Sequence, residues 1–331
     1  MKKMCAIILL LSLMVPAVGY AASKDWPQRE IRIIVPYKEG GASHRTAMLI
    51  KGIVKKENLL SEPMVVVCMP AAATLMGQEE VLKADPDGYT LLIHHNAMLN
   101  NNALGRQKFT YTDFRPICQV YRANLALAAR IDAPFDDMVE LLAYIKKHPG
   151  ELKWTWAGLG GNTHFCSYLL YEKAGLVPGK DVVPVITKGD SESCTYLAGK
   201  LADVAIAQPS SLSEFVKAGK FKLLGQSSDH VMNMFGKDIK PFNQQGADYS
   251  YNLRLLFFAP KDTPDDVVSK IEDVLKKVVT SDKYIDTMNS LVQDPEFLSG
   301  DDAAEAFGSE AGYSNMIGAK IKEAMAKQGK K

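Results

Sequence analysis

The 331-residue sequence has no strong excess of charge of either sign. Its 39 lysine and arginine residues are matched by 38 aspartate and glutamate residues, which gives a formal net charge of +1. A protein that binds a nucleic-acid backbone or an anionic membrane surface would carry a large basic excess or a basic run. We therefore expect neither as a partner, and we interpret Lys327, Lys330 and Lys331 as a solvated helix end.

Long apolar runs are absent after Val18, and a helix needs about 20 apolar residues to span a bilayer. The mature chain is therefore expected to be soluble. The one apolar run, residues 6–15, follows two N-terminal lysines, and Gly19 and Ala21 suit a cleavage site. This predicts a cleavable signal peptide over residues 1–21 and a periplasmic location. A retained membrane anchor is the alternative, for which the run is short.

Cysteine is scarce, with five in the chain, and Cys5 falls within the expected signal peptide. The other four are widely spaced and match no zinc-binding pattern: Cys68, Cys118, Cys166 and Cys194. In an oxidising compartment they permit three full pairings, and buried free thiols are an equally open interpretation. We expect no metal ion and no other cofactor.

Catalytic motifs are also missing. The sequence has no Gly-x-Ser-x-Gly elbow, no His-Glu-x-x-His helix and no Walker loop. His164 and Cys166 would lie about 200° apart around a helix, too far for a catalytic dyad. His94 and His95 are adjacent on a strand and point to opposite faces, which argues against a metal pair, although His95 can reach a binding cleft. We therefore expect no enzymatic activity.

Alternating strand and helix patterns dominate the chain and predict an α/β fold with mainly parallel sheets flanked by helices. Strands are expected at residues 31–35, 64–67, 89–93, 125–129, 153–157, 182–186, 204–206, 222–225 and 255–259. Helices are expected at residues 44–56, 74–84, 138–147, 163–174, 211–218, 264–280, 284–291 and 303–327.

The length suits two lobes better than one core. Extended segments near 125 and 255 bracket a compact middle block. This pattern predicts a discontinuous first lobe, residues 22–124 plus 253–331, and a second lobe, residues 125–252. Two consecutive domains are the alternative that the sequence leaves open.

Two glycine-rich loops, each between a strand and a helix, are the candidate ligand site. Paired glycines let the backbone approach a ligand, and a following helix start can bind an anion through its N–H groups. A turn that needs glycine only for its geometry is the competing interpretation. One such loop in each lobe would hold the two ends of a dicarboxylate. The first loop and helix start offer Tyr37, Gly40, Gly41, Ala42, Ser43, His44 and Arg45. The second offers Gly158, Gly160, Asn162, Thr163 and His164, with Ser43 and either Asn162 or Thr163 as expected helix caps.

The second loop approaches the dinucleotide fingerprint but departs from it. Thr163 stands at the third glycine position, and Asp181 precedes its strand instead of ending it. Nucleotide binding is therefore disfavoured. A third loop adds Lys188 and Gly189 as candidates, although a solvated lysine is the ordinary interpretation. Trp156 is a further candidate, with burial as its alternative, and the two loop histidines can also be local caps.

Together these stretches resemble the TctC/Bug family, the periplasmic receptors of tripartite tricarboxylate transporters. The resemblance extends from Trp26 to near the C-terminus. It is carried by residues 33–37 with Gly40-Gly41, by the string Asp-Pro-Asp-Gly-Tyr-Thr-Leu-Leu at 85–92, by residues 157–160 with Thr163-His164, and by Lys188-Gly189 with residues 197–203.

The resemblance implies a two-lobe periplasmic binding protein of type II, a Venus flytrap that closes on its ligand. It further implies a carboxylate ligand held largely by backbone amides and waters of the two loops. The implied partner is the membrane permease of the transporter, with one large and one small subunit. We expect a monomer. A sensor subunit for a signalling kinase, or an enzyme on the same scaffold, are the alternative functions.

The sequence departs from the family at its first loop. The family usually has an acidic residue after the glycines, where this chain has His44 followed by Arg45. The family's Glu-Asn-Arg-Pro-Gly-Ala-Gly-Gly run is replaced by residues 67–74, and Trp156 stands where small residues are usual. These changes predict a more positive cleft and a ligand with at least two carboxylates.

Overall fold

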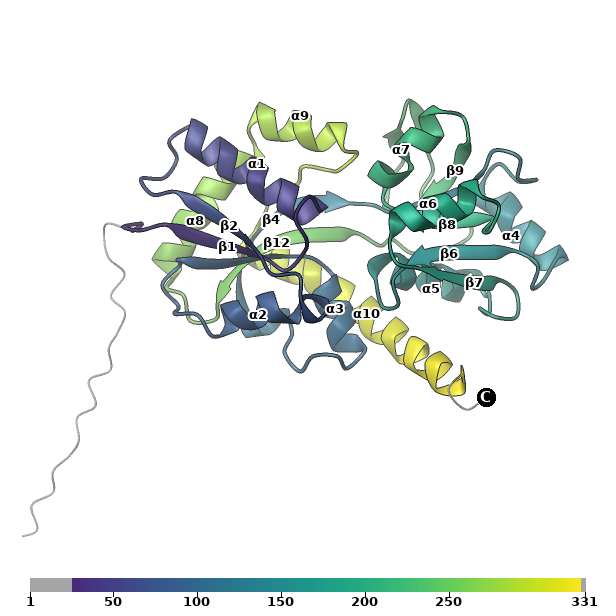
Figure 1. The fold of residues 1–331 in the computed structure, drawn as a ribbon, viewed down its shortest axis with the longest axis horizontal. Coiled ribbons are helices and arrows are strands. Elements are labelled where there is room, and N and C mark those ends of the chain that lie inside the picture. Colours follow the sequence, from purple (N-terminus) through teal and green to yellow (C-terminus); the bar gives the residue numbers. More distant parts are fainter. Residues whose placement is uncertain (1–25, 329–331) are drawn as a thin grey trace, which may run out of the picture.

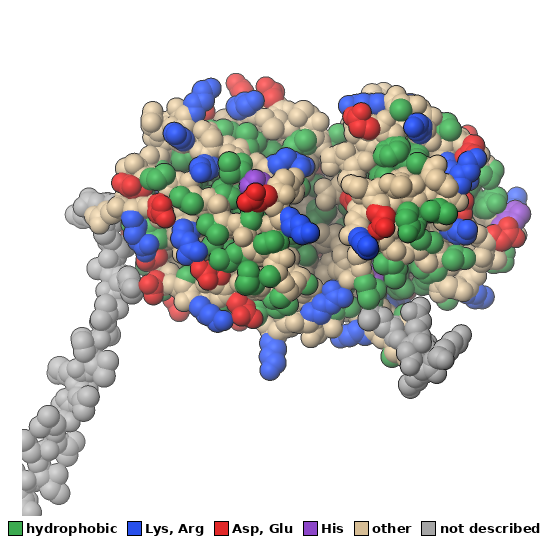
Figure 2. Space-filling model, viewed as in Figure 1, with side chains coloured by type: hydrophobic (Ala, Val, Ile, Leu, Met, Phe, Trp, Pro, Cys, Tyr) green, Lys and Arg blue, Asp and Glu red, His purple; other side chains and the backbone are tan. Residues whose placement is uncertain are grey.

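The computed structural model describes residues 26–328, so the signal peptide expected over residues 1–21 lies outside the described part. Two α/β lobes lie side by side, each built around its own sheet (Figure 1). On the face shown in Figure 2, acidic and basic side chains are interspersed over both lobes without a patch of one sign.

The first sheet has six strands in the order β13-β4-β12-β3-β1-β2. The strands are β1 (Ile31–Val35), β2 (Met64–Cys68), β3 (Thr90–His94), β4 (Phe114–Ala123), β12 (Leu253–Pro260) and β13 (Leu298–Ser299). Its helices are α1 (Ala42–Lys56), α2 (Leu75–Leu82), α3 (Ala97–Ala103), α8 (Asp265–Val279), α9 (Asp282–Ser290) and α10 (Gly300–Gln328). The lobe also contains the short 3-10 helices η1 (Ala72–Thr74) and η2 (Tyr111–Asp113).

The second sheet has five strands in the order β7-β6-β8-β5-β9. The strands are β5 (Ala126–Arg130), β6 (Lys153–Ala157), β7 (Val183–Thr187), β8 (Val204–Ala207) and β9 (Phe221–Gln226). Its helices are α4 (Met138–Lys147), α5 (Asn162–Ala174), α6 (Asp190–Ala198) and α7 (Pro209–Lys217). A hairpin of β10 (Met232–Met234) and β11 (Lys237–Ile239) and the 3-10 helix η3 (Phe242–Gln244) follow β9.

The predicted α/β class is confirmed, but both sheets are mixed, so the expectation that they are mainly parallel was wrong. The parallel part of each is a set of three strands, β2-β1-β3 in the first and β7-β6-β8 in the second. Antiparallel strands extend each set: β12 pairs with β3 and β4, and β5 pairs with β8 and β9. The antiparallel pairing arises beside the crossings between the lobes. Strands β4 and β5 carry the chain out of the first lobe, and β12 brings it back in the opposite direction.

Strand β1 shows how the first sheet is buried on both faces. Ile33 and Val35 pack in the cluster that contains Ile271 of α8, whereas Ile34 faces the cluster that contains Val81 of α2. This follows from the two-residue period of side-chain direction in a strand. Helices α1 and α9 accordingly lie on one side of the sheet, and α2 and α3 on the other (Figure 1).

The two crossing segments between the lobes are tied together by Ser227. The N–H of Leu125 donates to Ser227 Oγ at 2.9 Å, and Ser227 Oγ donates to the carbonyl of Tyr251 at 2.6 Å. Ser227 itself is fully buried. One hydroxyl therefore bridges the outgoing and the returning strand.

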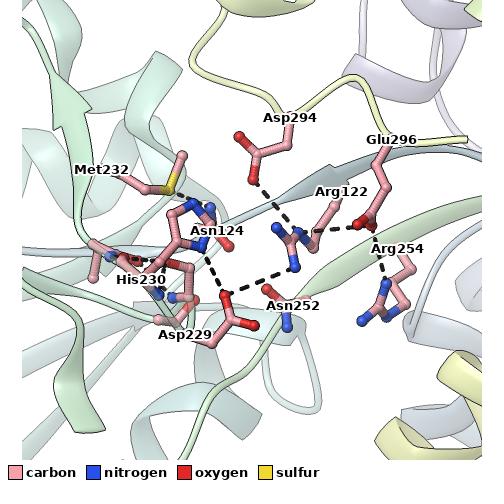
Figure 3. A network of polar contacts seen from close by, with 12 residues as sticks. Arg122, Asn124, Asp229, His230, Met232, Asn252, Arg254, Asp294 and Glu296 are labelled. Carbon is pink, nitrogen blue, oxygen red and sulfur yellow. Dashed lines mark hydrogen bonds and ion pairs between the residues drawn. The ribbon is translucent and has the colours of Figure 1, made fainter. Parts of the chain in front are cut away.

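Arg122 lies beside this crossing, among three carboxylates (Figure 3). Its guanidinium is 3.9 Å from Asp229, 3.5 Å from Asp294 and 3.8 Å from Glu296. A hydrogen bond with His230, and then the charge of Arg122, lower the pKa of Asp229. Since Asp229 follows β9 and Asp294 follows α9, Arg122 connects the two lobes electrostatically.

A buried carboxyl group from α10 contacts the returning segment. Glu310 Oε1 accepts from the N–H of Asn252 at 3.4 Å and lies 3.9 Å from Arg254 Nε. Burial raises the pKa of Glu310 from 4.5 to about 7, against the opposing effect of Arg254. This carboxyl is therefore largely protonated in the folded protein at pH 6.

Glu310→Gln tests this assignment through the pH dependence of stability. The folded pKa of Glu310 lies above its unfolded pKa, so the stability that it contributes is complete at low pH and is lost as pH rises from about 4.5 to about 7. Glutamine cannot ionise. We therefore expect the free energy of unfolding of the variant, relative to that of the parent, to rise by roughly 2–3 kcal/mol between pH 5 and pH 8. Urea unfolding at both pH values measures this, with the exposed Glu305→Gln as control. A gap between variant and parent that stays constant with pH would contradict the assignment.

Candidate functional site

The last two glycines of the two glycine-rich loops have the same backbone conformation. Gly40 and Gly160 are left-handed, with φ of 77° and 83°. Gly41 (φ −67°, ψ 165°) and Gly161 (φ −71°, ψ 169°) are the extended N-cap residues of α1 and α5. Each strand thus enters its helix through a left-handed and then an extended glycine.

The expected caps Ser43, Asn162 and Thr163 were wrong, because α1 and α5 begin at residues 42 and 162 with glycine caps. Ser43 and Thr163 are instead buried within the first turn. Thr163 Oγ1 folds back on Ala157, accepting from its N–H at 2.9 Å and donating to its carbonyl at 3.1 Å. Its hydroxyl therefore joins the helix to the end of β6.

A histidine closes each loop. The N–H of Gly40 donates to His44 Nδ1 at 3.1 Å, and the N–H of Gly160 donates to His164 Nδ1 at 2.9 Å. Both loops therefore share the string Gly-Gly-x-Ser/Thr-His with the same internal hydrogen bond. The matching string is visible in the sequence, and aligning the two loops would have revealed it.

The helix starts that follow have no side-chain cap. The first three N–H groups of each helix, residues 42–44 and 162–164, have no acceptor within the helix, and neither helix has a side-chain cap or an acidic residue in its first turn. By contrast, Asp137 caps α4, and Ser281 caps α9. The partial positive charge at these two helix starts is thus left without a compensating anion.

Asn162 joins the second loop to the first lobe. Its Oδ1 accepts from Asn100 Nδ2 at 2.9 Å and from the hydroxyl of Tyr251 at 3.2 Å. Its Nδ2 lies 3.3 Å from His95 Nδ1. Asn100 and Tyr251 were not among the residues selected from the sequence, and only the fold places them at the loop.

The ring of His95, which Asn162 contacts, packs with Tyr37 of the first loop and with His94. Tyr37 stacks on His95 with ring centroids 4.6 Å apart, and its hydroxyl lies 3.3 Å from His95 Nδ1 and 3.4 Å from His94 Nδ1. Burial raises the pKa of Tyr37, lowers that of His94 to about 4, and, together with His94, lowers that of His95 well below its ordinary value. All three rings are therefore uncharged at neutral pH.

Arg106 crosses from the first lobe to the second loop. Its Nη2 donates to the carbonyl of Leu159 at 3.0 Å. A Cβ at Gly160 would lie 2.6 Å from Arg106 Nη1 and 2.6 Å from Leu104 Cδ1. No sequence pattern marks this residue, which is a lone arginine in the segment between α3 and η2.

Three candidates lie outside the contacts between the second loop and the first lobe. Trp156 is 1% exposed and lies beneath the second loop, stacked on His164. Lys188 and Gly189 precede α6, whose first turn already carries acidic residues, and the N–H of Lys188 donates to Glu192. This third loop nevertheless adjoins the second, since the N–H of Gly158 donates to the carbonyl of Thr187 at 2.7 Å.

Arg45 is exposed, and its guanidinium donates to the carbonyl of Gly40. Both polar backbone atoms of Gly40 are therefore engaged by the first turn of α1, the N–H by His44 and the carbonyl by Arg45. The two side chains that suggested a positive cleft are thus bonded to their own loop.

The described residues contain four free cysteines and no group of His, Cys, Asp and Glu side chains that could hold a metal ion. Three of the thiols, those of Cys118, Cys166 and Cys194, are buried, and burial raises their pKa values. Over the same residues, no helix has the length and apolar character that a membrane crossing requires.

Known proteins share this architecture. A "TctC solute binding protein from Polaromonas" superimposes with a TM-score of 0.78 at 21% identity, covering 89% of this chain and 99% of that one. MatC from Rhodopseudomonas palustris, solved with malate, gives a TM-score of 0.72 at 20% identity (88% and 100%). The R. palustris protein Rpa4515, solved with adipate, gives 0.74 at 20% identity (90% and 99%). The fold is therefore that of the two-lobe periplasmic binding proteins, as the sequence predicted.

Sequence comparison agrees with the fold. A UPF0065 protein of Bordetella pertussis is 28% identical over 294 residues, 88% of this chain and 87% of that protein. The sequence profile described as "Tripartite tricarboxylate transporter family receptor" matches residues 49–317. The chain therefore belongs to the TctC family of solute receptors, which confirms the resemblance.

Proposed function

We propose that this protein is a periplasmic receptor that binds a small organic acid with two carboxylates between its lobes and delivers it to a tripartite transporter. The observation that carries the proposal is the matched pair of uncapped helix starts at residues 42–44 and 162–164, one in each lobe. In this proposal residues 1–21 direct export, and the partner is a membrane permease with a large and a small subunit. The protein would act as a receptor and not as an enzyme.

The choice of a carboxylate follows from the chemistry of the helix starts. Three N–H donors and a positive dipole end favour a small anion. Two such groups, facing one site from two lobes, suit a ligand with an anionic group at each end. The relatives solved with malate and adipate fit this reasoning, since both acids carry two carboxylates.

The proposal places the anion on backbone groups. The sequence suggested that His44 and Arg45 would make the site positive, but His44 Nδ1 accepts from Gly40 and Arg45 donates to Gly40. The preference for a dianion is therefore assigned to the two sets of N–H groups. In the proposal Tyr37, His95 and Asn162 contribute uncharged polar groups beside them.

Closure of the lobes would complete the site. In this proposal the first lobe comprises residues 22–124 and 253–331, and the second comprises residues 125–252. The hydrogen bonds Asn100–Asn162 and Arg106–Leu159 then join opposite lobes. A ligand favours this closed arrangement only if it binds the closed form better than the open form.

A thermal-shift screen of the purified mature protein tests the ligand class. Malate and adipate are compared with their diamides, which keep the length but lose both charges. A carboxylate at 100 times its Kd stabilises the folded protein by about 2.7 kcal/mol, which is readily detected. Equal stabilisation by acid and diamide, or stabilisation only by cationic compounds, would reject the proposal.

Ala42→Pro removes one N–H from the first helix start without breaking α1. Proline is well tolerated at the first helical position, and Gly41 has the extended conformation that a following proline requires. We expect adipate or malate affinity to fall roughly 10- to 100-fold, the value of one hydrogen bond to a charged group. The melting temperature of the empty protein should change little.

Isothermal titration calorimetry measures the effect, with Ala42→Ser as the matched control. The serine keeps the N–H and adds one oxygen, so it should bind like the parent. Parent-like affinity in Ala42→Pro would exclude this helix start from the site.

Gly160→Ala tests whether the lobes close on the second loop. The new methyl group would displace Arg106 and break its bond to Leu159, which destabilises only the closed form. Gly158→Ala is the matched control, because Gly158 has a similar φ of 68° but open space around its Cβ position. Both variants carry the strain of a left-handed alanine, about 1–2 kcal/mol.

Small-angle scattering with and without ligand, together with titration calorimetry, separates the two variants. We expect Gly160→Ala to bind about tenfold more weakly than Gly158→Ala, which corresponds to a loss of about 1.4 kcal/mol in the closed form. Equal affinities and equal compaction would mean that Arg106 plays no part in closure.

A further inference from the structure

We propose that His44 and His164 are a matched pair of positioning residues. Each neutral imidazole holds its glycine loop through Nδ1 and leaves the helix-start N–H groups free for the ligand. This inference deepens the proposed function, since it assigns how the two loops of that site are held. It also replaces the expectation that His44 contributes positive charge to the ligand.

The direction of the hydrogen bonds fixes the tautomer. A backbone N–H can only donate, so His44 Nδ1 and His164 Nδ1 must carry a lone pair where they meet Gly40 and Gly160. A neutral ring then has its proton on Nε2. Protonation of Nδ1 would set two donors against each other and release the glycine. The loop geometry therefore requires the uncharged form of both side chains.

Aromatic packing holds His164 in this orientation. The ring is 1% exposed and stacks on Trp156 at 5.0 Å with an interplanar angle of 7°. Tyr168 contacts it edge-on at 4.6 Å and 84°. Burial, and then the charge of Arg106, lower the pKa of His164 to about 3. Trp156 thus has a role in the site although it is buried beneath the second loop.

Each loop combines a histidine with an arginine. In the second loop, the peptide group that joins Leu159 to Gly160 donates its N–H to His164 and accepts from Arg106. In the first loop, Gly40 donates to His44 and accepts from Arg45. The first pair comes from one helix, whereas the second draws its arginine from the opposite lobe. The hydrogen bonds of the two histidines therefore form within each lobe and do not depend on closure of the lobes.

A fixed loop matters because glycine is the most flexible residue. Without a partner for its N–H, the left-handed glycine of each loop would sample several conformations, and ordering it would oppose binding. A histidine that occupies this N–H fixes the loop before the ligand arrives. Its role is to position the loop, and no contact between its ring and the ligand is needed.

Asparagine and glutamine substitutions distinguish positioning from direct contact. Asparagine Oδ1 can occupy the place of histidine Nδ1, whereas glutamine reaches toward Nε2. With adipate and malate as probes, we expect His44→Asn and His164→Asn to bind within about threefold of the parent. His→Ala and His→Gln at either position should bind roughly 5- to 10-fold more weakly, the value of one neutral hydrogen bond. His148→Ala, which lies in neither loop, serves as the control.

The outcomes are separable. Rescue by asparagine supports positioning through Nδ1. Rescue by glutamine but not asparagine would assign Nε2 to the ligand, and parent-like binding by both alanine variants would remove any role. Either of the last two results overturns the inference.

A second measurement does not depend on variants or on knowledge of the ligand. Nitrogen-15 NMR of the imidazole rings in the empty protein at pH 7.5 should show unprotonated Nδ1 and protonated Nε2 for both residues. A charged ring, or a proton on Nδ1, would overturn the inference. If neither acid binds, the proposed function fails on the screen, while the tautomers still report on the loops.

Discussion

The proposed site depends on one hydrogen bond that is made twice, from a left-handed glycine N–H to the Nδ1 of a histidine four residues later. This bond turns a flexible glycine pair into a defined bend. The bend delivers the chain into a helix whose first three N–H groups are still without a partner within the helix. Acidic side chains stand in the first turn of α4, α6, α8, α9 and α10 but not in that of α1 or α5. Helices α2, α3 and α7 also lack an acidic first turn and a side-chain cap, so what distinguishes α1 and α5 is the matched glycine–histidine loop that precedes each of them.

The rest of the fold joins the two lobes that carry these helix starts. The strands that cross between the lobes are joined through Ser227, and Arg122 links them electrostatically (Figure 3). Helix α10 adds a third connection, because it begins on the first lobe and reaches α5 of the second, where Lys320 pairs with Glu172 (Figure 1). Contacts at the crossing segments and along α10 therefore connect the two lobes in the arrangement that the structure shows. Within it, Asn162 meets Asn100 and His95.

Local patterns in the sequence predicted the α/β alternation, both glycine loops and the family. They missed the short helix α3, which has three asparagines and no clear apolar period, and they failed where the answer depended on long-range pairing. Strand β4 was missed because Arg115, Pro116 and Gln119 interrupt its apolar residues without a regular period, and its place in the sheet is set by β12, far away in sequence. The mixed sheets were missed because a buried parallel strand and a buried crossing strand have the same apolar pattern. Arg106 and Asn100 have no local motif at all, and only the closure of two distant segments makes them part of the site.

The decisive measurement is a crystal structure of the mature protein with a bound dicarboxylate. We expect one carboxylate within hydrogen-bonding distance of the N–H groups of residues 42–44 and the other within hydrogen-bonding distance of those of residues 162–164. His44 Nδ1 and His164 Nδ1 should still accept from Gly40 and Gly160 in that complex. A ligand bound through the guanidinium of Arg45, or one that displaces either histidine from its glycine, would show that the backbone N–H groups and the histidines do not have these roles.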